Sequence, residues 1–297
     1  MSGHITVMAR EAVDALLVAP SSVVVDATAN GGGHSARIAE LVNTEGKLIS
    51  IDIDPRACAA LRERMKDAPQ VHVHEANFRN IDHVVQTEGV SKVNAILADL
   101  GWSTNQFETA EGYEGRGFSF NRDEPLLMTY GDPATYAFTA HHIVNGWKEE
   151  DIANVLYGYA DERHSRKIAR AIVAARETAT IKTSGALADI ILQAMPRKGK
   201  LHPATKTFQA LRIAVNDELG ALTEFIEKSI ALLVPGGRLA IITFHSIEDR
   251  IVKHTFKAHV EKGEGINPIK KPLTPTDAEL QENPRARSAK LRIFEKT

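Results

Sequence analysis

Aspartates and glycines stand where short apolar runs end in the first third of this 297-residue chain. Asp26, Asp52 and Asp99 each lie at or near the end of such a run, and Gly31–Gly33 follow the first of them. Glycines between a strand and a helix let backbone N–H groups come close to a ligand. A carboxylate at the end of the next strand, about 20 residues on, can bind both hydroxyls of a ribose. This spacing favours a site for a nucleoside-containing cofactor.

The charge of these strand ends narrows the class of cofactor. Residues 31–36 lack the final glycine of the dinucleotide fingerprint, although alanine is tolerated there. No Gly-Lys-Ser/Thr follows the glycines, which excludes a P-loop. The Asp26 carboxylate would repel a pyrophosphate and attract a cation. S-adenosylmethionine carries a sulfonium and an ammonium group, so these residues favour it over NAD.

A parallel sheet is the arrangement that would bring these residues together. Strands are predicted at Val23–Asp26, Lys47–Asp54, Val71–Phe78 and Val93–Leu100, with helices at Ser35–Val42 and Pro55–Lys66. Helices between strands imply right-handed crossovers and a parallel sheet covered on both faces. Ligands of such sheets bind beyond the carboxyl ends of the strands, where the aspartates stand.

The strand pattern stops after Leu100 and resumes near the end of the chain. Helices are predicted at Lys148–Tyr159, Ala160–Glu177 and Phe208–Val234, and Pro235–Gly237 stop the last of them. A strand at Arg238–Phe244, a helix at Arg250–Val260, a loop over 263–284 and a strand at Ala289–Phe294 follow. We therefore expect an α/β core of residues 1–105 and 207–297, interrupted by a helical insertion at 106–206.

Composition is that of an ordinary folded protein. Hydrophobic residues make up 43% and charged residues 25%, which argues against disorder and coiled-coil rods. Cys58, the only cysteine, cannot form an internal disulfide, and His72 and His74 lack the further ligands of a metal site. The sequence has neither a signal peptide nor an apolar run long enough to span a bilayer, so we expect a cytoplasmic protein without a bound metal.

Positive charge is concentrated in two stretches, although the formal net charge is −2. Residues 160–212 hold eleven Lys and Arg against four Asp and Glu, a net charge of +7. Residues 250–297 hold eleven against six, a net charge of +5. Such asymmetry is typical of a surface that binds a polyanion, and solvated helix faces would explain it equally well.

Six stretches of the chain resemble one protein family, in the same order. They are Asp26–Ser35, Asp99–Gln106, Arg116–Phe120, His202–Ile213, Phe244–Arg250 and Asn283–Ser288. From His4 to Arg292 the chain resembles the bacterial small-subunit ribosomal RNA cytosine-N4 methyltransferases of the MraW/RsmH type. The resemblance implies a class I, Rossmann-like S-adenosylmethionine-dependent methyltransferase core with an inserted helical domain. The implied substrate is N4 of a cytidine in the decoding region (P site) of 16S rRNA, within the small ribosomal subunit. Neither DNA nor a membrane is an expected partner.

The family's functional residues carry over to matching positions of this chain. The implied cofactor contacts are Gly32, Gly33, His34, Asp52, Phe78, Asp99 and Gln106. Of these, Asp52 would lie at the ribose and Phe78 beside the adenine. Asp99 is also the candidate catalytic residue, because an acceptor on the N4 amine would make it more nucleophilic and take its proton. Three alternatives stay open, namely Phe78 as a core residue, His34 as a cap of the following helix, and Asp99 as a cofactor contact without a catalytic role.

RNA contacts are expected from cations and aromatic rings. The expected RNA-binding residues are Arg116, Arg163, Arg166, Lys167, Arg170, Lys206, Arg212, Arg285 and Arg287. Phe118, Phe120 and Trp102 are candidates for stacking on a base that has been lifted out of its helix. The two phenylalanines fit the core of the insertion equally well.

The chain departs from the family pattern at three places. Asn30 stands where glycine is usual, and asparagine tolerates left-handed backbone, so the turn is expected to persist. Residues 125–130 read Pro-Leu-Leu-Met-Thr-Tyr where the family has Pro-Leu-Asp-Met-Arg-Met. One acidic and one basic residue are therefore missing beside the site, at Leu127 and Thr129. Residues 102–104 read Trp-Ser-Thr where Val-Ser-Ser is common.

Two other functions remain open at this stage. A methyltransferase for a small molecule or a protein would keep the cofactor site and would not need the basic insertion. A non-catalytic ribosome-assembly factor would keep RNA binding and lack turnover. A hydrolase is disfavoured because no G-x-S-x-G motif presents a nucleophile.

Overall fold

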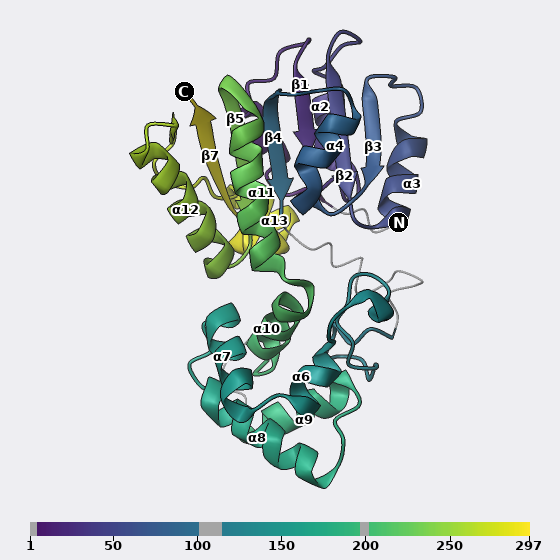
Figure 1. Ribbon diagram of the computed structural model, residues 1–297, viewed down its shortest axis with the longest axis vertical. Helices are drawn as coiled ribbons and strands as arrows, with labels where there is room; N and C mark the ends of the chain where they lie inside the picture. The colour runs from purple at the N-terminus through teal and green to yellow at the C-terminus, as the bar shows by residue number, and fades with distance from the viewer. Residues whose placement is uncertain (1–4, 101–114, 197–201) are drawn as a thin grey trace. The chain divides into compact units, whose positions relative to one another are not determined.

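The computed structural model describes residues 5–100, 115–196 and 202–297, and Figure 1 follows its elements along the chain. These residues form two compact units. One consists of residues 5–100 and 219–297, and the other of residues 115–196 and 202–218. Gln106 and residues 102–104 lie outside the described residues.

In the described residues of the first unit, a seven-stranded sheet has the order β3-β2-β1-β4-β5-β7-β6. Its strands are β1 (Val23–Asp26), β2 (Lys47–Asp52), β3 (Val71–Glu75), β4 (Val93–Asp99), β5 (Leu233–Thr243), β6 (Gly265–Ile266) and β7 (Lys290–Lys296). Strands β1 to β5 pair in parallel, and β7 runs antiparallel to β5. This sheet confirms the expected α/β class with a Rossmann-like core.

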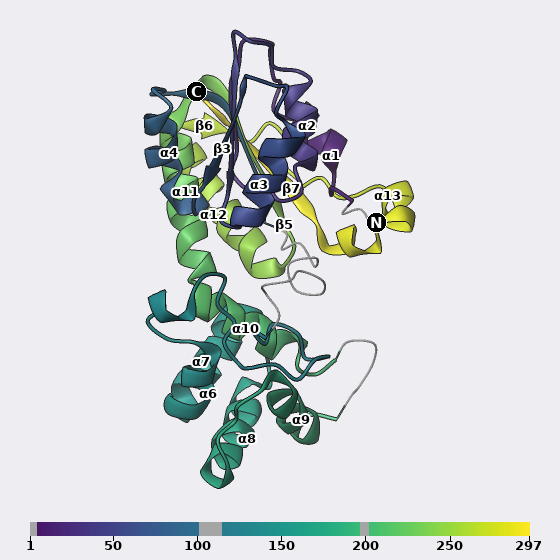
Figure 2. The same ribbon diagram turned by 90° about the vertical axis from the view of Figure 1, so that its right-hand side faces the viewer.

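Helices cover both faces of the sheet. Successive strand residues point to opposite sides, and here both sets are apolar, so each face packs against helices. Val25 and Ile49 pack with α4 (Ile81–Thr87), α11 (Glu218–Leu232) and α12 (Ser246–Glu261). Val24 and Leu48 pack on the other side with residues of α1 (Ala9–Asp14) and α2 (Gly33–Ala39). α3 (Pro55–Arg64) contacts β2 and β3. Figure 2 shows α4 and α11 on one side of the strands, with α1 and α2 on the other.

The second unit is built from helices around a separate apolar core. Its helices are α6 (Ala140–Gly146), α7 (Glu149–Ala160), α8 (Ser165–Thr178), α9 (Ser184–Ala194) and α10 (Thr205–Asn216). Phe118 and Phe120 pack against this core. The Phe118 ring stacks on Tyr130 at 5.6 Å, and the Phe120 ring stacks on His202 at 4.6 Å. Both rings therefore have the packing that the core alternative predicted.

The single helix predicted over 208–234 is two helices in the structure. α10 ends at Asn216, Asp217 has a left-handed backbone with φ 48°, and α11 begins at Glu218. The Asn216 side chain donates to the Met128 carbonyl at 2.7 Å and accepts the Tyr130 N–H at 3.0 Å. Aspartate adopts left-handed geometry more readily than most residues, which permits the break. As a result α10 belongs to the helical unit, whose second segment ends at residue 218.

Short elements occupy the region predicted as a loop over 263–284. They are β6 and the six-residue α13 (Asp277–Glu282). The Thr276 hydroxyl caps α13 by accepting the Glu279 N–H at 3.2 Å. Elements this short carry too little apolar periodicity for sequence to predict them.

Two of the arginines expected to bind RNA make internal contacts in the helical unit. Arg116 donates to the carbonyls of residues 129–131 at 2.6–3.0 Å. Arg212 forms a two-point ion pair with Glu218, with N···O distances of 2.8 and 3.0 Å. The Tyr130 hydroxyl donates to the same Glu218 carboxylate, and burial raises the pKa of Tyr130 well above its usual value. Tyr130, a departure from the family motif, is thus part of a buried network that ties 128–131 to the end of α10.

Candidate cofactor site

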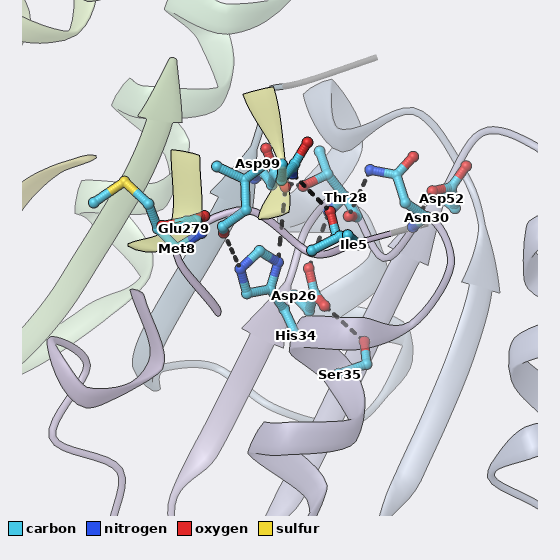
Figure 3. A network of polar contacts seen from close by, with 12 residues as sticks. Ile5, Met8, Asp26, Thr28, Asn30, His34, Ser35, Asp52, Asp99 and Glu279 are labelled. Carbon is cyan, nitrogen blue, oxygen red and sulfur yellow. Dashed lines mark hydrogen bonds and ion pairs between the residues drawn. The ribbon is translucent and has the colours of Figure 1, made fainter. Parts of the chain in front are cut away.

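The three aspartates lie at the carboxyl ends of neighbouring strands. β1 stands between β2 and β4 in the sheet, so Asp26 lies between the chains that carry Asp52 and Asp99. Figure 3 shows these strand ends with the turn that follows β1. The exposed fractions are 0% for Asp26 and 6% for each of the other two residues. The sheet therefore brings three largely buried carboxyl groups to one edge.

Asp26 is held beneath the turn rather than at its surface. Its carboxylate accepts the Ser35 hydroxyl at 2.6 Å, and Ser35 in turn contacts Ser50 at 2.9 Å. Burial raises the pKa of Asp26 to about 6, and the bond from Ser35 partly opposes that shift. Because this side chain is fully buried, it can repel a pyrophosphate or attract a cation only through its electric field, as the sequence led us to expect.

Asp52 has the geometry that a ribose-binding carboxylate requires. One oxygen accepts the backbone N–H of Asn30 at 2.7 Å, and the other accepts that of Asp54 at 2.8 Å. An ionised carboxylate has about four acceptor positions, so the Asp52 carboxylate retains acceptor capacity for a ligand hydroxyl group. Asn30 adopts φ 45°, so this departure from the family's glycine preserves the turn. Burial raises the pKa of Asp52, and hydrogen bonds from the backbone N–H groups of Asp54, Asn30 and Ile53 counteract that shift.

The glycine turn is fixed by contacts with other parts of the protein. Gly32 has φ 75°, and a Cβ on it would lie 2.6 Å from the side chain of Leu61. A Cβ on Gly33 would overlap the Thr6 side chain. Glycine is therefore required at position 32 by its left-handed backbone and at position 33 by the close packing of Thr6.

Asp99 and His34 lie beside each other at the end of β4. The Asp99 backbone N–H donates to the Thr28 hydroxyl at 2.6 Å. His34 Nδ1 lies 3.8 Å from an Asp99 carboxylate oxygen, and its Nε2 lies 3.2 Å from the Val7 carbonyl. The alternative of His34 as a helix cap is not what the structure shows, since Gly32 is the N-cap of α2 and no side chain caps it.

Phe78 is half-buried, at the start of a short 3-10 helix, Phe78–Asn80. Its ring packs edge to face on Phe225 of α11, with centroids 5.2 Å apart. This contact fits the core alternative, while partial exposure leaves part of the ring available to an adenine. Its role as a cofactor contact stays a prediction.

Several groups that shape this site were not predicted from the sequence. Thr28 and Ser35 bond to strand-end residues, and the segment at residues 5–8 contacts Gly33 and His34. Glu279 accepts the Met8 N–H at 2.6 Å across 271 residues of sequence. Thr28 and Ser35 lie within the Asp26–Ser35 motif that the sequence identifies. In contrast, no local sequence pattern predicts a contact between Met8 and Glu279, which are 271 residues apart.

Exposed cations gather at the start of α8. Arg163, Arg166, Lys167 and Arg170 are all exposed, and Arg170 lies 3.6 Å from Glu149 of α7. Lys206 is exposed and donates to the Asp161 carbonyl at 2.9 Å. Arg285 and Arg287 are exposed on a 3-10 helix of the other unit, Pro284–Ser288.

No group of three or more His, Cys, Asp and Glu in the part that the structure describes is placed to hold a metal ion. No helix within 5–100, 115–196 and 202–297 is long and apolar enough to cross a membrane.

The sheet order, with its single antiparallel partner for β5 and a carboxylate ending β2, defines a class I methyltransferase fold. The model of the MraW methylase family matches residues 1–297. A ribosomal RNA small subunit methyltransferase H from Paenibacillus sp. (strain JDR-2) is 43% identical, with all of both chains covered. The chain therefore belongs to the MraW methylase family, whose members are S-adenosylmethionine-dependent methyltransferases.

Solved structures that align with this chain include two streptococcal proteins. A Streptococcus thermophilus rRNA methylase has a TM-score of 0.47 and 14% identity, with 99% of each chain covered. A Streptococcus mutans putative methyltransferase in complex with SAH has a TM-score of 0.48 and 13% identity, with 99% of this chain and 100% of that one covered.

The raised pKa of Asp26 predicts how stability depends on pH. The folded protein binds a proton here more tightly than the unfolded chain, whose carboxyl has a pKa of 3.8. This group therefore lowers the free energy of unfolding by about 2 kcal/mol as pH rises from 4 to 7. In Asp26→Asn that contribution is absent. Urea unfolding of both proteins across this range measures the difference, and parallel curves would contradict the assignment.

Proposed function

We propose that the protein transfers the methyl group of S-adenosylmethionine to N4 of a cytidine in the decoding region (P site) of 16S rRNA. The proposed substrate is the rRNA within the small ribosomal subunit, in the cytoplasm. The observation that carries the proposal is the full-length relative, 43% identical, that is named a ribosomal RNA small subunit methyltransferase H. The strand-end carboxylates and the basic surface of α8 support the same proposal.

The residues at the strand ends suit the proposed cofactor. Asp52 would bind the ribose hydroxyls through its remaining acceptor positions. Phe78 would lie beside the adenine, and Gln106 would contact the cofactor near the end of β4. Gly32, Gly33 and His34 would border the cofactor from the turn after β1. When bound, S-adenosylmethionine supplies a methyl group on a positively charged sulfur.

Asp99 would assist the amine that is methylated. The N4 lone pair of cytosine is delocalised into the ring, so an acceptor on the N–H would concentrate electron density on nitrogen. The Asp99 carboxylate, largely buried at the end of β4, and the Leu100 carbonyl would provide such acceptors. As the new bond forms, the proton of the amine would pass to an Asp99 carboxylate oxygen.

The exposed cations of α8 would bind the phosphates of the RNA. Arg163, Arg166, Lys167 and Arg170 provide four exposed positive charges within eight residues. Lys206, Arg285 and Arg287 remain further candidates. Arg116 and Arg212 are less suited, because both are partly buried and hold parts of the helical unit together.

One experiment tests the proposed reaction. The purified protein is incubated with labelled S-adenosylmethionine and small subunits from cells that lack the modification, and the label is mapped by mass spectrometry of rRNA fragments. Label on N4 of one decoding-region cytidine is the expected result. Label only on protein or on small molecules would indicate the first alternative function, and RNA binding without transfer would indicate an assembly factor.

Asp99→Asn keeps a polar group of similar size but cannot accept a proton. We expect its single-turnover rate at saturating cofactor to fall about 100-fold or more, the usual contribution of a general base. Asp67→Asn, an exposed position between α3 and β3, is the control and should match the wild type. A variant at position 99 that binds cofactor and retains full turnover would remove the proton-accepting role.

Charge removal on α8 should change the salt dependence of RNA binding. Each lost phosphate contact reduces the slope of log affinity against log salt by about 0.7 to 0.9. The double variant Arg163→Gln/Arg166→Gln should therefore show a slope reduced by up to about 2. The control Arg10→Gln/Lys66→Gln removes two exposed charges from the other unit and should leave the slope unchanged. Equal slopes for all three proteins would argue against this surface.

A further inference from the structure

The segment at residues 5–8, here called the N-terminal strap, contacts two residues of the proposed cofactor site. The Thr6 side chain packs so closely on Gly33 that no Cβ fits between them. The Val7 carbonyl lies 3.2 Å from His34 Nε2. A carbonyl can only accept, so Nε2 carries the hydrogen of this bond. The bond thereby orients the imidazole with Nδ1 toward Asp99, 3.8 Å away.

The strap is held from its other side by residues near the end of the chain. Glu279 of α13 accepts the Met8 backbone N–H at 2.6 Å. The Asn283 side chain, at the C-cap of α13, donates to the Ile5 carbonyl at 3.3 Å. Figure 3 shows Met8 and Glu279 beside His34 and Asp99. These two bonds fix the main chain of the strap at both of its ends.

The backbone of the strap is strained at the residue that Glu279 holds. Met8 has φ 48° and ψ 37°, a left-handed conformation that costs a non-glycine residue stability. Such strain persists where the surroundings enforce it, and it is common at ligand sites. Here the enforcing groups are the Glu279 carboxylate and the apolar core, in which Met8 is 1% exposed.

We propose that Glu279 and Asn283 are positioning residues for the cofactor site. They hold the strap, the strap orients His34 and closes against Gly33, and these residues border the cofactor beside Asp99. The inference rests on the cofactor part of the proposed function and is independent of the RNA substrate. It assigns a role to α13 and to Asn283 at the start of the Asn283–Ser288 motif, in which only Arg285 and Arg287 were expected to bind RNA.

The burial of the strap distinguishes a positioning role of Glu279 from a general contribution to the stability of the fold. Val7 and Met8 are 7% and 1% exposed in the apolar core, so the strap remains attached when one polar bond is lost. What changes is the path of its main chain over Gly33 and His34. Loss of Glu279 should therefore affect cofactor affinity and exchange of the Met8 amide more than it affects global unfolding.

The test compares Glu279→Ala with Glu279→Gln, which retains a neutral acceptor, and with the control Asp277→Ala on the exposed start of the same helix. Calorimetry with S-adenosylhomocysteine measures affinity, and hydrogen exchange without ligand measures protection of the Met8 amide. Glu279→Ala should lose about tenfold in each, the effect of a missing bond to a charged group. Glu279→Gln should stay within about threefold of the wild type, since it keeps an acceptor. Asp277→Ala should be unchanged.

The outcomes separate the inference from the proposed function. Wild-type protein that is folded and binds no S-adenosylhomocysteine would overturn the cofactor assignment itself. Wild-type binding with an unchanged affinity in Glu279→Ala, despite faster exchange at Met8, would overturn only the positioning role. Unchanged exchange at Met8 would show that Glu279 does not hold the strap. If Glu279→Ala does not fold, Asn283→Ala removes the second bond and is judged by the same two measurements.

Discussion

The site depends on the burial of three carboxyl groups at the ends of adjacent strands. Carboxylates taken out of water destabilise a fold unless donors satisfy them. The first turn of α2 supplies the Ser35 hydroxyl as a donor to Asp26, and the turn before it supplies the backbone N–H of Asn30 as a donor to Asp52. The Thr28 hydroxyl in the same turn accepts a hydrogen bond from the backbone N–H of Asp99. The conformation of this turn and the positions of the three acids therefore determine each other.

The three acids differ in what they can do. Asp26 is fully buried, and its raised pKa reflects a structural position under the turn. Asp52 and Asp99 retain slight exposure, and Asp52 has acceptor positions left for a ligand. A negative field from these groups favours a cationic methyl donor over a phosphate-bearing cofactor. Burial therefore distinguishes Asp26, which is sealed beneath the turn, from Asp52 and Asp99, which are the two acids proposed to contact the ligand.

Sequence predicted the elements that have strong local patterns. The bounds of β1 are those expected from its apolar run, and the predicted strands ending near Asp52 and Asp99 are present. The break at Asp217 was missed because apolar spacing continues from α10 into α11. Asn216 and Asp217 are residue types that commonly end helices, so the signal was available.

Other features have no local signal at all. Residue type shows that Arg116 and Arg212 are cations, but it does not show that one bonds three carbonyls and the other pairs with Glu218. The bond between Met8 and Glu279 joins opposite ends of the chain, and only the folded sheet brings them together. Such contacts are properties of the tertiary structure, so the strap could not be derived from motifs.

The most direct test of the account is calorimetric titration of S-adenosylhomocysteine into the wild-type protein and Asp52→Asn at pH 7.5. The account predicts one binding site in the wild type and about tenfold weaker binding in the variant, because a charged acceptor for the ribose is lost. Absence of binding by well-folded wild-type protein, or equal affinity in both proteins, would contradict a cofactor site at these strand ends.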